Sequence, residues 1–213
     1  MSAHTSAPSS PLARGPAAGV SQAHESAVAQ VAGAVHYIDD LPEVRGTLYA
    51  APILSTVAHG KLLGVDSTAA RAMPGVVDVL LSADIPGDPM LAAFAGDEPV
   101  FAMDTVNFVG QVVGVVVAKT VMQARQAARK VQLNIEPLPA ILSVQQALEA
   151  QSFVLPPVHV RRGDAEAALA ASQHSLHGTL EVGGQEHFYL EGQIAYVLPL
   201  EQNQWWVYSL SLI

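Results

Sequence analysis

The 213-residue chain has ten Lys and Arg residues against nineteen Asp and Glu residues, a net charge of −9 and no cysteine. The acidic balance disfavours nucleic acid as a partner. The absence of cysteine excludes disulfides and cysteine-ligated zinc or iron–sulfur sites on this chain. The longest apolar run, residues 112–118, is too short to span a bilayer. We therefore expect no membrane partner and, with no apolar signal segment visible at the N-terminus, a cytoplasmic location.

The first elements are expected to alternate between extended segments and one short helix. Residues 1–24 are rich in Ser, Ala, Pro and Gly, which predicts a flexible leader. Residues 37–42 are expected to be extended and to close with a turn, because a proline disfavours helix in the residue before it. Residues 47–55 combine aromatic and β-branched residues and predict a buried strand. A short Ala-rich helix should begin after Asp66 or Ser67 and end at the Pro74-Gly75 pair.

A strand, a helix and a second strand follow. Residues 76–81 predict a short strand, and the Pro- and Gly-rich residues 85–98 predict a loop. Residues 111–119 form the clearest strand, residues 120–129 a helix and residues 131–135 a further strand. This order favours a right-handed crossover and an α/β domain. The basic residues of the helix, Arg125, Arg129 and Lys130, are interpreted as a solvated face.

The last third of the chain looks like the beginning of a second unit. A helix is expected over 143–150, and the Pro156-Pro157 pair marks a linker. Gly163-Asp164 should cap a helix over 165–171. Three strands are then expected, over 175–182, 193–199 and 204–209. One helix and three strands bury too little surface to be stable alone, so we expect that the chain is truncated.

One segment, residues 183–191 (GGQEHFYLE), concentrates groups capable of chemistry. Two glycines allow a close backbone approach to a bound group. Gln185 can donate a hydrogen bond from its amide, which an ionised carboxylate cannot do. The alternative is a turn before a strand, with the apolar residues in the core. A metal site formed by His174, His177 and His187 is disfavoured, because capping and surface positions account for the first two, and we expect no metal ligands from the protein.

The GGQEHFYLE segment resembles the one that places a glutamine beside molybdenum in the xanthine dehydrogenase and aldehyde oxidoreductase family. The resemblance is collinear over nearly all of residues 26–209. Four segments resemble the a/b hammerhead domain of that family, and two resemble its bacterial xanthine dehydrogenase branch. The hammerhead-like segments are residues 31–42, 58–66, 70–87 and 108–120, and the branch-like segments are residues 155–169 and 182–196.

The resemblance implies an α/β (α+β) fold in which a hammerhead domain precedes the truncated start of a molybdenum-cofactor-binding domain. The implied boundaries are a leader at 1–24, the hammerhead domain at 26–140, a linker at 141–160 and the cofactor-binding start at 161–213. It implies that Gln185 is catalytic, hydrogen-bonding an oxo ligand of the metal. Gly184, Gln185 and Phe188 would contact the molybdopterin cofactor.

The implied reaction is hydroxylation of a purine, with electrons leaving through 2Fe-2S clusters and FAD to NAD. The clusters and the flavin would lie on a small partner subunit, in a dimer of large–small pairs. The family's substrate-binding residues and base glutamate have no counterpart here, so the chain alone is expected to be inactive, and Glu186 and Glu191 are interpreted as structural. Two alternatives remain open: hydroxylation of an aldehyde or another N-heterocycle, and a non-catalytic interaction or assembly module.

Overall fold

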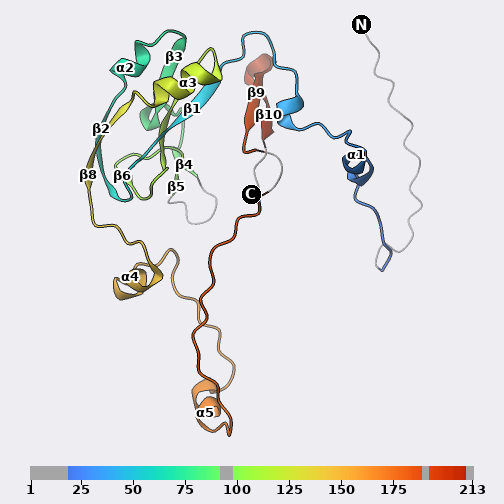
Figure 1. Ribbon diagram of the computed structural model, residues 1–213, viewed down its shortest axis with the longest axis vertical. Helices are drawn as coiled ribbons and strands as arrows, with labels where there is room; N and C mark the ends of the chain where they lie inside the picture. Colours follow the sequence, from blue (N-terminus) through green and yellow to red (C-terminus); the bar gives the residue numbers. More distant parts are fainter. Residues whose placement is uncertain (1–18, 92–97, 189–191, 210–213) are drawn as a thin grey trace. The chain divides into compact units, whose positions relative to one another are not determined.

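The computed structural model describes residues 19–91, 98–188 and 192–209. The chain divides into two compact units. One comprises residues 43–181, and the other combines residues 1–42 with residues 182–213. Figure 1 shows the elements of both units in chain order. The greater part of the predicted leader, residues 1–18, lies outside the described residues, and residues 19–24 contain no helix or strand.

The larger unit is built around an antiparallel sheet of three strands. Its strands are β1 (Tyr49–Leu54), β7 (Val112–Ala118) and β3 (Val76–Leu81). They lie in the order β1-β7-β3, so β7 is central. This position agrees with the continuous apolar run predicted for β7, because a central strand with both faces covered requires apolar residues on each side. Val116 of β7 is fully buried.

Two helices cover this sheet. α3 (Val121–Ala128) contacts β1, β7 and β3, and α2 (Thr68–Arg71) contacts β3. α3 begins at Thr120, whose hydroxyl oxygen accepts a hydrogen bond from the backbone N–H of Gln123. Such a cap satisfies one of the N–H groups that the first helical turn leaves unpaired. The predicted helices in both places are confirmed.

A second sheet shares the core of the first. It comprises β6 (Thr105–Val106), β2 (Gly60–Asp66) and β8 (Gln132–Pro137), in the order β6-β2-β8. Val79 and Val116 of the first sheet and Val106 of the second belong to one buried apolar cluster, and the half-buried Ile135 of β8 packs against it. The helix and strands predicted at 111–135 are confirmed, but their predicted connection is wrong. β7 and β8 belong to different sheets, and every strand pair in the described residues is antiparallel, so no parallel crossover forms.

The predicted loop over residues 85–98 contains two very short strands. β4 (Met90–Leu91) pairs with β5 (Glu98–Pro99), and the 3-10 helix η2 (Ser82–Asp84) precedes them. Residues 92–97 lie outside the described residues. Further along this unit come the helices α4 (Val144–Glu149) and α5 (Ala165–Ala170), both predicted. Their N-caps are Ser143 and Asp164, and each side chain accepts a backbone N–H three residues on.

The smaller unit contains two short helices and a hairpin. α1 (Ala27–Val31) is followed by the 3-10 helix η1 (Ile38–Asp40). β9 (Ala195–Pro199) and β10 (Trp205–Ser209), both predicted as strands, pair antiparallel around the 3-10 helix η3 (Glu201–Asn203). The rings of Tyr196 and Trp206 each stack on the ring of Tyr208. The Tyr196–Tyr208 contact crosses between the two strands, whereas Trp206 and Tyr208 lie on the same face of β10. A cross-strand aromatic contact helps to hold a two-stranded hairpin together, although such a hairpin is marginal by itself.

Three local expectations differ from the structure. Residues 37–42 contain the η1 turn rather than an extended segment, because the Asp40 carboxylate accepts the backbone N–H of Tyr37 and closes a turn. Residues 175–182 form no strand, since no described segment pairs with them and a strand requires a ladder partner. The strand β2 was not predicted, because its two glycines and the register shift between Leu62 and Gly64 obscure the alternation.

Candidate functional site

The segment that the sequence marks as chemically dense is an exposed, irregular stretch of backbone. Residues 183–188 lie outside every helix and strand, and all six are exposed. Gln185 makes no hydrogen bond within the described part of the chain, so its amide N–H groups are available to a bound group. The remaining residues of the motif, Tyr189, Leu190 and Glu191, lie outside the described residues.

The two glycines of this segment are not required by the chain's own packing. A Cβ atom built on Gly183 or Gly184 would meet nothing within 4 Å, and neither residue has a positive φ. A glycine that the surrounding fold does not require is compatible with close approach of a ligand to the backbone. The open backbone and the donor amide of Gln185 fit the requirements of a cofactor with oxygen-rich polar groups.

Phe188 has an unusual conformation for a bulky residue. Its φ is +51°, in the left-handed region, and its side chain is 90% exposed. A non-glycine residue in this region is strained by roughly 1–3 kcal/mol. No burial of the ring within the described chain offsets that strain. The arrangement is expected where a further group covers the ring.

The histidines near this segment do not assemble a metal site. The described residues contain no group of three or more His, Cys, Asp or Glu side chains positioned to hold a metal ion. His174, His177 and His187 are exposed. The chain thus offers a hydrogen-bond donor and open backbone at 183–188, but no protein ligand set for a metal among these residues.

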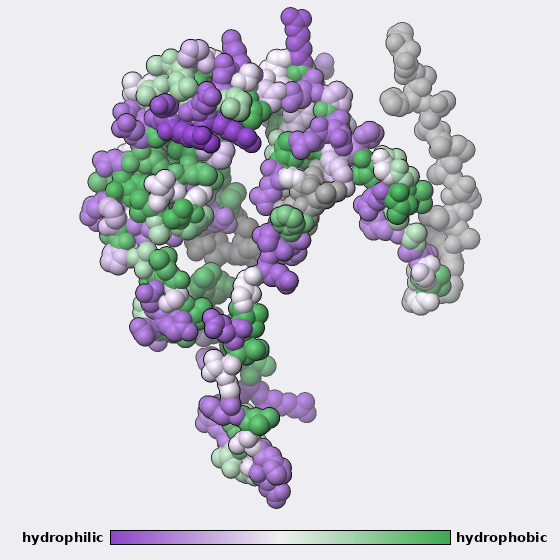
Figure 2. All heavy atoms as spheres, in the orientation of Figure 1, coloured by the Kyte–Doolittle hydropathy of each residue, from purple (hydrophilic) through white to green (hydrophobic). Residues whose placement is uncertain are grey.

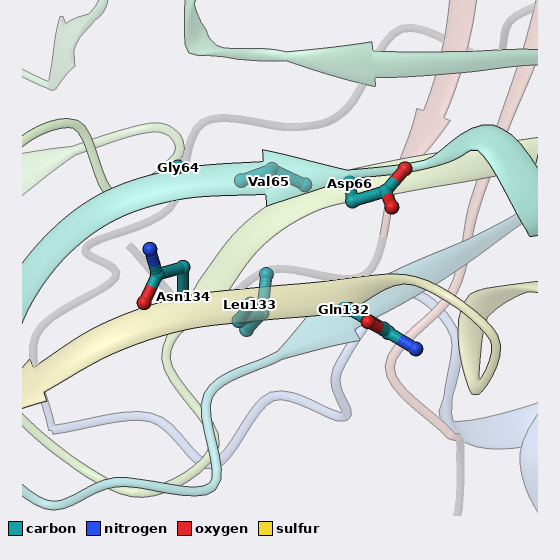
Figure 3. A pocket seen from close by; sticks show the side chains of 6 residues that line it. All are labelled: Gly64, Val65, Asp66, Gln132, Leu133 and Asn134. Atoms are coloured by element: carbon teal, nitrogen blue, oxygen red, sulfur yellow. The ribbon is translucent and has the colours of Figure 1, made fainter.

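A surface hollow of about 520 Å³ lies on the second sheet of the larger unit. It is lined by three consecutive residues of β2, from Gly64 to Asp66, and three of β8, from Gln132 to Asn134. In Figure 3 the carboxylate of Asp66 and the amide of Gln132 lie toward one end and the amide of Asn134 toward the other. The carboxylate already accepts the backbone N–H of Thr68, 2.9 Å away. The hollow contains no second titratable group, so it offers no acid–base pair.

A larger groove, of about 760 Å³, lies where the loop before β7 meets the segment around α4. Its one histidine, His59, has its Nδ1 atom 2.8 Å from the carbonyl oxygen of Pro139. The buried Gln111 shapes the neighbouring turn by accepting the backbone N–H of Asn107 through Oε1, at 2.6 Å. Sequence reasoning did not single out His59 or Gln111. Both contacts hold loops in place, and neither supplies a reactive pair.

An arginine clamp fixes the position of α2, and sequence reasoning missed it too. Arg71 donates through Nη1 to Oδ1 of Asp78 and through Nη2 to the carbonyl oxygen of Val79, both at 2.6 Å. The Arg71 guanidinium, and then the backbone N–H of Val79, hold the pKa of Asp78 below its ordinary value of 3.8. The backbone N–H of Thr68 similarly lowers the pKa of Asp66.

These features define a mixed α/β domain of two antiparallel three-stranded sheets. Residues 32–139 match the family described as "Aldehyde oxidase and xanthine dehydrogenase, a/b hammerhead domain". Residues 147–212 match the "Molybdopterin cofactor-binding domain". The chain belongs to the aldehyde oxidase and xanthine dehydrogenase family, and it combines the hammerhead domain with the start of the molybdenum-cofactor-binding domain. The resemblance and the fold class predicted from the sequence are confirmed.

Named relatives support the same family. The chain is 45% identical over 181 residues to xanthine dehydrogenase 1 of Arabidopsis thaliana, covering 84% of this chain and 13% of the relative. It is 40% identical over 182 residues to aldehyde oxidase 2 of Cavia porcellus, covering 85% and 13%. The aldehyde oxidoreductase structure from Desulfovibrio gigas matches with a TM-score of 0.74 and 26% identity, over 87% of this chain and 23% of that one. The chain thus spans about an eighth of the length of these curated relatives.

Within the described residues, no helix is both long and apolar enough to cross a membrane.

Proposed function

We propose that this chain is part of the molybdenum-binding subunit of an enzyme that hydroxylates hypoxanthine or xanthine, in the cytoplasm. The observation that carries the proposal is the 45% identity with a xanthine dehydrogenase over 84% of the chain. The GGQEHFYLE segment at 183–191 lies within the residues that match the molybdopterin cofactor-binding domain. Electrons would leave through 2Fe-2S clusters and FAD on a partner unit and reach NAD. The absence of cysteine supports a division of labour in which the clusters are bound elsewhere.

Gln185 is the residue of this chain that we assign to the reaction. Its amide has no partner within the described residues and would donate a hydrogen bond to the cofactor. Gly184 would let the backbone approach the cofactor, since a side chain there would occupy the open space beside it. Phe188 would cover the cofactor with its ring, and that burial would offset its strained backbone. When bound, the molybdenum cofactor supplies the oxidation and oxygen-transfer chemistry.

The experiment that tests this function uses the complete subunit, of which this chain forms a part, together with its partner unit. Replacing Gln185 by alanine should leave the molybdenum content unchanged and lower kcat about 100-fold, as expected when one preorganised donor is lost. Gln185→Glu is a matched variant, because the carboxylate keeps the length of the side chain but removes the donor. Full activity of both variants would remove Gln185 from the catalytic site.

A second candidate is hydroxylation of an aldehyde, favoured by the 40% identity with aldehyde oxidase 2. Substrate choice separates the two. We expect kcat/KM of the complete enzyme to be higher for xanthine than for an aromatic aldehyde such as benzaldehyde. The reverse order would replace the purine proposal with the aldehyde one.

The 213-residue chain by itself is expected to oxidise no xanthine and to bind molybdopterin weakly, because it holds only one of the proposed catalytic groups. Stoichiometric molybdenum in the purified chain, measured by elemental analysis, would contradict this. A soluble and stably folded chain that binds another protein but never the cofactor would instead favour the non-catalytic interaction module.

A further inference from the structure

We draw no further inference here: the strongest candidate, the groove of about 760 Å³ between the loop before β7 and the segment around α4, where Figure 2 shows hydrophobic residues on the surface, carries nothing, because nothing in the structure shows what covers side chains such as Phe108 and Leu142 in a chain that spans about an eighth of the length of its named relatives.

Discussion

The sheet region of the larger unit and the stretch over residues 154–180 contain similar aliphatic residues, but these are buried in the first region and exposed in the second. Ile53 and Val79 are almost completely buried in the sheet region. Val154, Val160 and Leu176 are more than 90% exposed in the later stretch. Both regions are rich in aliphatic side chains, so composition alone does not explain the contrast. Only the sheet region finds partner strands for its backbone.

The contrast teaches that apolar alternation becomes a strand only when a second strand completes the hydrogen-bond ladder. β7 lies between β1 and β3, contacts α3, and contributes Val113 and Val116 to the core that the two sheets share. Leu176 and Leu180 have the spacing of one strand face but no described partner. The extended stretch therefore contributes little to the stability of this chain, whereas the sheet region supplies most of it.

The largest expected effect comes from truncating one aliphatic side chain in each region. Ile53→Ala removes a buried side chain from the core cluster and should lower the free energy of unfolding by about 2–5 kcal/mol. Leu176→Ala removes a fully exposed side chain and should change it by less than about 0.5 kcal/mol. Urea unfolding followed by far-UV circular dichroism measures both. Equal losses would show that the later stretch is packed in solution.

Two glycines, one in the sheet region and one in the candidate site, should differ in how much an alanine substitution lowers the free energy of unfolding. The expected difference is smaller than that between Ile53→Ala and Leu176→Ala. Gly75 has a φ of +85°, and an added Cβ would collide with the side-chain amide of Gln123. Gly75→Ala should therefore lower the free energy of unfolding by about 1–3 kcal/mol. Gly184→Ala, where space is open and φ is ordinary, should leave it within about 0.5 kcal/mol. Thermal unfolding of the two variants checks this, and a large loss at Gly184 would mean that the glycine is needed by the fold itself.

The fold was predictable where a local pattern and its tertiary partner agree. The continuous apolar run of β7 and the Asp164 cap of α5 are local signals, and the structure confirms the elements they predict. The pairing of strands was not predictable in the same way. A strand–helix–strand order predicted a parallel crossover, but the register and sheet membership of β7 and β8 depend on distant segments of the chain.

The sequence indicated where the candidate site lies along the chain, but it did not indicate the backbone conformation there. The density of polar groups beside two glycines marked residues 183–191, of which the structure describes 183–188, and the resemblance implied a role for Gln185. Nothing in the sequence indicated the left-handed backbone of Phe188, because bulky residues seldom adopt it and its cause lies outside the local pattern. The Arg71 clamp was also missed, since its acceptor Asp78 is placed by the register shift in β3.

The smallest expected effect is a pH dependence that originates in this clamp. Because the folded-state pKa of Asp78 lies below 3.8, its carboxylate stabilises the fold fully above the unfolded pKa. That contribution is lost as the pH falls through the lower folded pKa. Asp78→Asn should therefore be less stable than the wild type near neutral pH, and the difference should shrink as the pH is lowered through and below 3.8.

Urea midpoints of both proteins across this acid range measure the effect. Asp104→Asn is the matched control, because Asp104 is an exposed carboxylate with no ion pair among the residues the structure describes. The control should show no comparable convergence with the wild type. A difference in urea midpoint between the Asp78 variant and the wild type that stays constant down to the lowest pH would contradict this. It would mean that the clamp stabilises the fold through hydrogen-bond geometry and not through the charge of Asp78. Because the clamp holds α2 against the sheet region, that result would mean that the charge of Asp78 is not a reason why the sheet region is more stable than residues 154–180.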